Sequence, residues 1–471
     1  YMVPAATMQI GAIPLNPNGK VDRRKLPAPV FSSGEKEDAR PLNDLEVQLS
    51  DIAAGILGHA DFGLTTNLLR AGLTSLSCIK LAALIDESLG VSVAVRDIMK
   101  TPTLLGIENA VISLLLTRKT AVKQAREKQE RYPLSQSQMG IYLDCQKDPG
   151  SIRYNVPFMV SLPADIDAQK LCDAVCAVID APPAVKARVA DGAQIPVGSP
   201  ASLSFERMSE PAFHALSKRF VQPFDLAKGP LYRAVVTKTP ERVSLLADFH
   251  HIAFDGGSLD LFLRELGAVY GGAKPAAEKL SAFDAALEET EREGSEGWLA
   301  DKAYFDERLK GFEGASEITP DIGQDGSKGA LQEIVQKADR EAVLAFCGST
   351  GVTPAALFLA AAAYAVGRWT QKADVYLSGI SSGRGDTRLL NTFGMFVRTL
   401  PLAIRRDKGQ SCLEFIRSAQ QALSDAVAHE GYPYVNIARD YGYSPSIMYT
   451  CELGVVSEYH IGGEAARFDG L

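Results

Sequence analysis

The stretch from Phe249 to Ser258, with the sequence Phe-His-His-Ile-Ala-Phe-Asp-Gly-Gly-Ser, constrains the fold more than any other part of the chain. The residues directly before it, 243–248, are mostly apolar and predict a buried strand. Those directly after it, 259–266, predict an apolar helix with Ser258 as its N-cap. The chain must therefore pass from a buried strand into a helix around two histidines and an Asp-Gly pair.

The two histidines, His250 and His251, stand at the end of the predicted strand. Neighbouring side chains on a strand point to opposite faces, so one ring can face a cavity while the other packs into the interior. We expect His251 to face the cavity and His250 to be structural. Asp255 is expected to hold the local geometry, and Gly256 allows backbone conformations that other residues would block. Taken alone, the same residues also fit an ordinary strand-to-helix corner with two structural histidines.

The pattern His-His-x-x-x-Asp-Gly resembles the condensation domains of nonribosomal peptide synthetases and their acyltransferase relatives. Five further stretches resemble motifs of these domains and follow the same order along the chain: 132–138, 148–151, 154–157, 223–233 and 391–402. The resemblance implies an α/β fold of two lobes, similar to two chloramphenicol-acetyltransferase halves, and the alternating predicted strands and helices agree with it. A tunnel between the lobes would open to a donor carrier on one face and to an acceptor carrier on the other.

The resemblance implies an enzyme that forms peptide bonds by attack of an acceptor amine on a donor thioester. The thioester is already activated, so the domain needs to supply positioning, a proton acceptor and stabilisation of the oxyanion. By this resemblance His251 takes the amine proton or orients the nucleophile, and the sequence leaves both roles open. The N–H of Gly256 and the hydroxyl of Ser258 are weaker candidates for contacting the oxyanion.

Asp255 is expected to hold its loop through a cation rather than to touch substrate. The family often has an arginine in the first lobe that would pair with this aspartate. In the corresponding segment here, 180–188, that arginine is replaced by Lys186 or displaced to Arg188. Lysine would keep the charge but not the bidentate geometry.

Residues 44–118 are predicted to be all-helical. The apolar spacing places one helix from Leu45 and a second from Ser75 to Leu89, which Gly90 ends as the C′ residue. Pro102 marks the start of another helix. The region resembles a peptidyl carrier protein, which implies a small bundle of four helices.

Ser75 follows Gly-Leu-Thr and precedes Leu76. In carrier proteins the serine in a Gly-x-x-Ser-Leu context bears covalent 4′-phosphopantetheine, although the family usually has Gly-Gly-His-Ser or Gly-Gly-Asp-Ser. A helix N-terminus favours anions, so a phosphodiester on Ser75 would lie in a favourable field. The competing interpretation is a plain N-cap serine. We expect the start of this helix to dock on the condensation region.

The resemblances divide the chain into six parts. Residues 16–20, Asn-Pro-Asn-Gly-Lys, look like the last motif of an adenylation domain, with Lys20 matching the lysine that contacts the acyl-adenylate. We expect no adenylation activity, because the rest of such a domain is absent. The expected parts are an adenylation remnant, a linker, the carrier, a second linker and two condensation lobes, at 1–29, 30–43, 44–118, 119–131, 132–300 and 301–471. The second lobe is expected to be incomplete and to lack a segment that bridges back to the first lobe.

Composition narrows the partners and the compartment. A net charge of −8 argues against nucleic acid or an anionic membrane as the main partner. The seven cysteines are scattered without a Cys-x-x-Cys pattern, and no histidine near Cys172 and Cys176 completes a metal site, so reduced thiols in the cytoplasm are expected. The expected partners are aminoacyl or peptidyl thioesters, the neighbouring adenylation domain, a downstream carrier protein and a phosphopantetheinyl transferase.

Two other functions compete with condensation. Epimerisation domains share the histidine motif, but they tend to continue Asp-Gly-Val-Ser-Trp, and residues 257–259 are Gly-Ser-Leu. A non-catalytic carrier and docking module is the second alternative, against which an intact His251 argues. Because the carrier precedes the condensation region, we expect it to serve the donor side.

Overall fold

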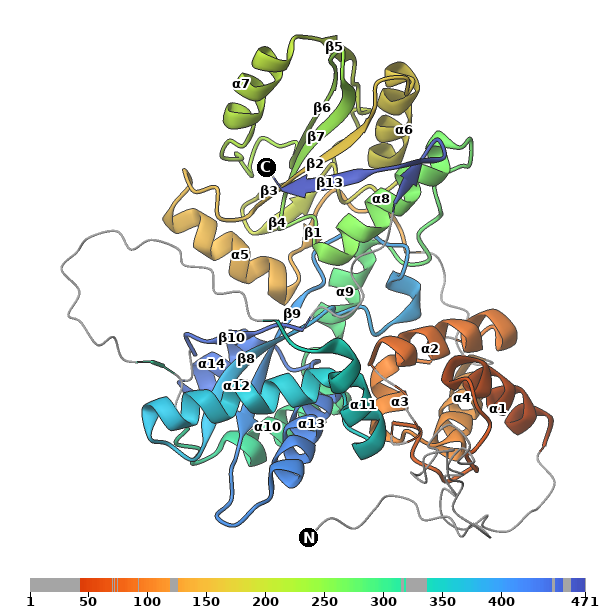
Figure 1. Cartoon of the computed structure of the whole chain (residues 1–471), viewed down its shortest axis with the longest axis vertical. Helices are drawn as coiled ribbons and strands as arrows, with labels where there is room; N and C mark the ends of the chain where they lie inside the picture. Colours follow the sequence, from red (N-terminus) through yellow and green to blue (C-terminus); the bar gives the residue numbers. More distant parts are fainter. Residues whose placement is uncertain are drawn as a thin grey trace, which may run out of the picture.

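The computed structural model in Figure 1 describes residues 43–69, 71, 73, 75–91, 93–118, 126–314, 317–318, 337–442, 445–451 and 459–470. The expected adenylation remnant at 1–29 with Lys20, and the linker at 30–43 apart from Asn43, lie outside these residues. So does 119–125 of the second linker.

Four helices form the carrier region: α1 (Asp44–Leu57), α2 (Ser75–Leu89), α3 (Val95–Lys100) and α4 (Leu104–Arg118). Asn43 and Glu46 close the start of α1 with a reciprocal capping box. Helix α2 begins and ends where the sequence predicted, and Gly90 follows it with a φ of 64°. Each helix contributes to one buried core, which includes Leu49, Ile85, Ile98 and Ile107. The predicted all-helical region is therefore confirmed.

The first lobe of the condensation region is built on a five-stranded sheet in the order β13-β2-β7-β6-β5. Its strands are β2 (Asn155–Pro163), β5 (Phe205–Arg207), β6 (Tyr232–Lys238), β7 (Arg242–His250) and β13 (Arg467–Gly470). Strands β5 and β6 are parallel, and the other neighbours are antiparallel. The strand predicted before the histidines is β7, which is buried from Val243 to His250.

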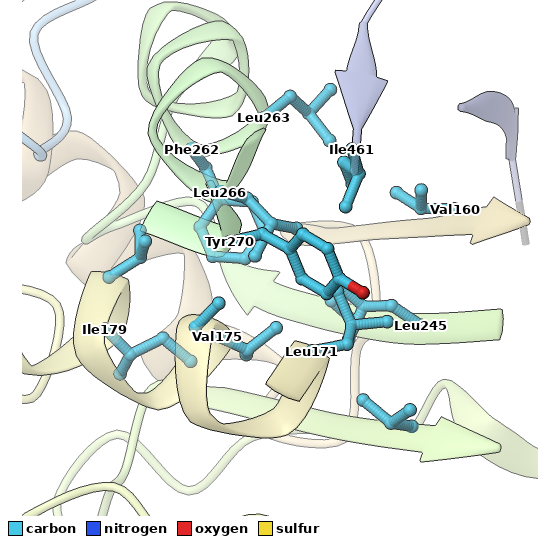
Figure 2. Packing of buried hydrophobic residues seen from close by; sticks show 14 of the residues in the cluster. Val160, Leu171, Val175, Ile179, Leu245, Phe262, Leu263, Leu266, Tyr270 and Ile461 are labelled. Atoms are coloured by element: carbon cyan, nitrogen blue, oxygen red, sulfur yellow. The ribbon is translucent and has the colours of Figure 1, made fainter. Parts of the chain in front are cut away.

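Helices cover both faces of this sheet. The helices of the first lobe are α5 (Gln136–Lys147), α6 (Ala168–Asp180), α7 (Glu210–Phe220) and α8 (Gly256–Tyr270). Figure 2 shows α6 and α8 packed on one face, where their apolar side chains surround Leu245 of β7. Helix α7 packs on the opposite face, where Phe213 joins Leu246 in another cluster. Since adjacent residues of β7 serve the two clusters, the strand lies buried between two helical layers.

The second lobe has a smaller sheet in the order β10-β8-β9. Its strands are β8 (Val375–Ser381), β9 (Arg398–Ile404) and β10 (Met448–Tyr449). Helices α12 (Pro354–Thr370) and α13 (Cys412–Ala428) share one apolar cluster with this sheet, whereas α10 (Glu296–Leu309) and α14 (Tyr434–Tyr441) share another. The remaining larger helices are α9 (Ala282–Arg292) and α11 (Arg340–Thr350). Both lobes are thus α/β, as expected.

The short elements connect these layers: β1 (Tyr132–Pro133), β3 (Arg188–Ala190), β4 (Ala193–Ile195), η2 (Thr387–Leu389), β11 (His460–Ile461) and β12 (Glu464–Ala465). Among the described helices no single one is long and apolar enough to cross a membrane, and only the sharply bent pair α11 and α12 passes that test of length and composition together.

The last described segment returns to the first lobe. Strand β13 pairs with β2, with Phe468 opposite Val160, and Ile461 is fully buried in the first-lobe core. A Cβ atom at Gly267 of α8 would lie 2.5 Å from the carbonyl oxygen of His460, so this glycine permits the close approach. The expectation that no segment bridges back to the first lobe is therefore wrong. Pairing with β13 covers an edge of β2 that would otherwise expose its backbone groups.

Candidate functional site

The histidine stretch forms a tight corner between β7 and α8. The N–H of His250 donates to the carbonyl of Leu231 at 2.9 Å, and that of His251 donates to the carbonyl of Tyr154 at 2.8 Å. Residue 154 opens one of the stretches that the sequence analysis identified, and β2 follows it directly. Backbone hydrogen bonds to neighbouring segments therefore fix the position of both histidines.

Asp255, and not Ser258, is the N-cap of α8. Its Oδ1 accepts the N–H of Ser258 at 2.7 Å. Aspartate and serine are similarly good N-caps, so the local sequence did not separate them. The hydroxyl of Ser258 instead donates to the carbonyl of Gly394 at 2.9 Å and accepts the N–H of the same residue at 3.0 Å. The prediction that Ser258 caps this helix is wrong, and its bonds with Gly394 leave it a poor candidate for the oxyanion.

The cation that holds Asp255 is Arg384. The Asp255 side chain is 0 % exposed, and its Oδ1 accepts from Nη2 of Arg384 at 2.9 Å. Its Oδ2 accepts the N–H of Phe396 at 2.9 Å. Nη1 of Arg384 donates to the carbonyls of Leu389 and Thr392 at 2.8 and 2.6 Å. The pair therefore clamps the first lobe, which carries the aspartate, to the loop of the second lobe that carries the arginine.

Neither of the predicted cations reaches Asp255. Nζ of Lys186 pairs with Asp180 at 2.7 Å, and Nη1 of Arg188 donates to the carbonyl of Ala227 at 3.1 Å. The prediction failed because it considered only cations of the first lobe, whereas the start of α8 faces the second lobe. Sequence reasoning missed Arg384 although it stands between two glycines, Gly-Arg-Gly, shortly after β8.

The two glycines at the start of α8 have different surroundings. A Cβ atom at Gly257 would lie 2.5 Å from Nε of Arg384, so glycine is needed there for the arginine to approach. A Cβ atom at Gly256 would have no neighbour within 4 Å. Gly256 is exposed at the first position of α8, where N–H groups have no partner inside the helix.

His250 is the last residue of β7 and lies in the interior, whereas His251 belongs to the turn that follows the strand. Nδ1 of His250 accepts the N–H of Ile252 at 3.2 Å, which places the ring proton on Nε2, 3.7 Å from the sulfur of Cys145. Phe224 packs edge-on against the ring. Burial, followed by the neighbouring His251, lowers the pKa of His250 to about 4. His250 is therefore a neutral ring in a fixed tautomer.

His251 is half-buried and has an unused hydrogen-bonding atom. Its Nδ1 is buried, and no described residue bonds to it. Buried polar atoms are nearly always paired, so an unpaired ring nitrogen is a feature that functional sites tolerate. Of the two histidines, His251 is therefore the less buried, and its Nδ1 is the ring nitrogen without a partner among the described residues.

A cavity of about 290 Å³ between the lobes reaches the back of this corner. Gln138 of α5 lines it and donates to the carbonyl of Ile252 at 2.8 Å. Met395 lines it and packs in the cluster that contains Ile252. Phe396 lines it and donates its N–H to Asp255. The cavity therefore ends beside the backbone of the histidine corner, and the two lobes share its walls.

The described residues contain no group of three or more His, Cys, Asp or Glu side chains that could hold a metal ion. Cys172 and Cys176, one helical turn apart in the sequence, both lie on α6. The other four histidines lie outside the corner, and His429 is bonded to Asp301 at 3.0 Å.

Comparison with known families matches the condensation domain to residues 128–445. The chain belongs to the condensation-domain family. The condensation domain is preceded by a second match, to a phosphopantetheine attachment site, at residues 47–111. The two matches follow one another in the order that the sequence analysis expected, and the second supports a covalently attached 4′-phosphopantetheine in the carrier region.

Similar proteins are large peptide synthetases. The chain is 27% identical over 462 residues to bacitracin synthase 1 of Bacillus licheniformis, covering 94% of this chain and 9% of that protein. It is 26% identical over 458 residues to tyrocidine synthase 3 of Brevibacillus parabrevis, covering 92% of this chain and 7% of that protein. The chain thus spans less than a tenth of the length of either relative.

Solved structures support the fold of the condensation domain. The first condensation domain of the calcium-dependent antibiotic synthetase, in complex with a substrate analogue, aligns with a TM-score of 0.59 at 20% identity, covering 72% of this chain and 84% of that chain. The starter condensation domain of rhizomide synthetase, in complex with C8-CoA, aligns with a TM-score of 0.58 at 22% identity, covering 72% and 83%. The two-lobed fold expected from the sequence is therefore confirmed.

The attachment region fits a phosphopantetheine group. Ser75, the predicted attachment residue, is the first residue of α2, and no residue in the first turn of that helix is acidic. The N–H groups of a first turn and the positive end of the helix dipole favour a phosphodiester. Ser75 is therefore the residue that we would expect to hold the group.

Proposed function

We propose that this condensation domain forms a peptide bond between an acyl thioester on its own carrier region and an aminoacyl group on a downstream carrier. The observation that carries the proposal is the histidine corner, which Asp255 and Arg384 clamp between the lobes while Nδ1 of His251 has no partner among the described residues. The amine attacks the thioester carbonyl, a C–N bond forms, the C–S bond breaks, and the amine proton leaves with the donor thiol.

The residues divide these tasks. His251 accepts the amine proton or a hydrogen bond from the amine, and thereby aligns the nucleophile. His250 and Asp255 do not touch the reacting atoms, because one is packed as a neutral ring and the other is fully engaged with Arg384 and backbone N–H groups. The exposed N–H of Gly256 is the group that we assign to the oxyanion.

The carrier region supplies the donor. 4′-Phosphopantetheine, attached to Ser75 by a phosphopantetheinyl transferase, contributes the thiol that holds the acyl group as a thioester. The aminoacyl group would come from an adenylation domain, and we keep the resemblance of residues 1–29 to the end of such a domain as part of this proposal. We also propose the boundaries 44–118 for the carrier and 132–300 and 301–471 for the lobes. Seven free cysteines agree with a reducing compartment, for which we propose the cytoplasm.

Ser75→Ala is expected to abolish attachment of the arm. The full chain is incubated with coenzyme A and a phosphopantetheinyl transferase, and intact-protein mass is measured before and after. The unchanged chain should gain one phosphopantetheine mass, while the variant gains none. Ser77→Ala, a serine two positions further along the same helix, is the matched control and should gain the arm. A mass gain in the Ser75 variant would show that another residue is the attachment site.

The carrier is expected to act as the donor. Arg126, inside the second linker, forms two hydrogen bonds with Glu291 of α9, at 2.6 and 2.7 Å. Only eight residue steps separate it from the end of α4 at Arg118, a reach of at most about 29 Å. This tether keeps the carrier beside the face that α9 forms and raises its effective concentration there, so a second carrier has to use another face.

The direction of transfer can be read from where the product accumulates. Ser75 is loaded with one aminoacyl-pantetheine, and a separate downstream carrier bears a second aminoacyl group. The dipeptide should appear on the downstream carrier, and its appearance on Ser75 would reverse the assignment. If the residue on Ser75 instead changes its configuration without any peptide being formed, the domain is an epimerisation domain.

A further inference from the structure

The carrier rests on the condensation domain through α3 and the last turn of α2 (Figure 1). The N–H of Val95 donates to the carbonyl of Gly385 at 2.8 Å. Asp86 of α2 pairs with Lys279, whose side chain is 61% exposed. Val427 of α13 packs against the apolar core of the carrier. Among the described residues, the docking contact includes a backbone hydrogen bond, an ion pair and an apolar contact.

This contact lies over the cavity between the lobes. Ala94 and Arg96, the neighbours of Val95 on either side, both line the cavity. Ala285 of α9 and Met395 belong to the walls that the condensation domain provides. The start of α3 is therefore one wall of a space whose other walls reach the back of the histidine corner.

In the docked carrier, the attachment residue Ser75 lies away from the Asp86 contact with the condensation domain. Asp86 makes the contact at one end of α2, whereas Ser75 is the first residue at the other end. Eleven helical steps separate the two, about 16 Å along the helix axis. The expectation that the start of the Ser75 helix docks is not what this arrangement shows. An arm on Ser75 would begin at the far end of the helix from the Asp86 contact.

We infer that α3 of the carrier is a removable wall of the cavity, so that the docked carrier is at rest and the cavity opens when the carrier leaves. The inference rests on the proposed function only for its consequence, which is that a loaded carrier must undock before its arm can enter. Such polar contacts suit a reversible association, because a single hydrogen bond contributes little and the Lys279 side chain of the ion pair is mostly exposed. Tethering through the linker lets so weak a contact persist.

A proline at position 95 tests the backbone contact. Val95 is the first residue of α3, a position that favours proline, and Ala94 before it already has the extended conformation that proline requires (φ −71°, ψ 139°). Val95→Pro therefore removes the N–H that binds Gly385 while keeping the helix. Val95→Ala is the matched control, because it also reduces packing in the carrier core but keeps the N–H.

Opening of the cavity is read as the rate at which a small maleimide labels Ala285→Cys, followed at the peptide that contains position 285 by mass spectrometry. Loss of one hydrogen bond should raise the open fraction, and with it the rate, about fivefold in Val95→Pro relative to Val95→Ala. Attachment of the arm at Ser75 should proceed in both variants, which shows that the carrier is folded. Equal labelling rates in the two variants would contradict the inference.

A disulfide tests the same wall from the other direction. Val95→Cys with Gly385→Cys should form a disulfide in the folded chain and lock the carrier in place, because a Cβ atom at position 385 would lie 3.7 Å from the Cβ atom of Val95. Labelling of Cys at 285 should then be suppressed, and reduction followed by removal of the reductant should restore it. Failure of the pair to link, or unchanged labelling after linking, would overturn the inference. Since labelling requires no peptide synthesis, this result is independent of whether the domain condenses amino acids.

Discussion

Asp255→Asn is expected to lower the free energy of unfolding of the condensation domain by about 3–5 kcal/mol, because it leaves a buried guanidinium without its counter-charge. The Asp255 side chain is 0 % exposed and that of Arg384 is 8 % exposed, so water cannot compensate for the lost carboxylate. Urea denaturation measures the change. Both tryptophans of the chain, Trp298 of α10 and Trp369 of α12, lie on helices that pack against the second-lobe sheet and report its unfolding through fluorescence.

A double change identifies the partner of Asp255. Asp255→Asn combined with Arg384→Met should be less destabilised than the sum of the two single variants, by about 0.5–3 kcal/mol, because each change alone leaves the other charge unpaired. The matched control combines Asp255→Asn with Lys186→Met, whose ammonium group pairs with Asp180 instead. The effects of that combination should simply add. Recovery with Lys186 and none with Arg384 would mean that the clamp between the lobes is assigned to the wrong cation.

The parts of the fold that the sequence predicted are those with local signals. Helix α2 was predicted from Ser75 to Leu89 because its apolar residues repeat with helical spacing and Gly90 adopts the left-handed conformation that ends it. The corner after β7 was predicted because a buried apolar run meets Asp-Gly before another apolar run. In both cases the deciding residues lie within a few positions of one another.

The parts that the sequence did not predict depend on contacts between distant segments. Arg384 is 129 positions from Asp255, and only the packing of one lobe on the other brings them together. The same holds for β13, which pairs with β2 although most of the condensation domain separates the two strands in the sequence. The N-cap of α8 was misplaced for a related reason: Asp255 and Ser258 are equally suitable by local preference, and bonds to Arg384, Phe396 and Gly394 from the second lobe decide between them.

For the two histidines of the candidate site, the sequence predicted different roles but not the contacts of each ring. Alternation along a strand predicts that their side chains diverge, but β7 ends at His250 and His251 lies in the turn that follows, so alternation does not account for the greater burial of His250. Which atoms remain free could not be predicted, because the partners of His250 are the backbone of Ile252 and the sulfur of Cys145 on α5. The available Nδ1 of His251 is likewise a property of the assembled site.

His251→Ala in the full-length protein is expected to reduce dipeptide formation about 10²–10⁴-fold, the usual effect of removing a group that accepts or orients a proton. Folding should be nearly unchanged, because the ring of His251 is half-buried and none of the described residues bonds to its Nδ1. Product is measured with a loaded donor and a loaded acceptor, so that neither adenylation nor attachment of the arm limits the rate.

His250→Ala is the matched comparison, one position away and of the same residue type. It removes a 4 % exposed ring that contacts Phe224, Ile252 and Cys145, so it should lower stability and soluble yield. If the two rings have the assigned roles, the His251 variant forms dipeptide more slowly but keeps its free energy of unfolding. The His250 variant has a lower free energy of unfolding. Unchanged product formation by a folded His251 variant would remove that ring from the reaction. Gly256 would then be the remaining candidate of the corner, since the oxyanion contact that we propose for its N–H needs no proton acceptor beside it.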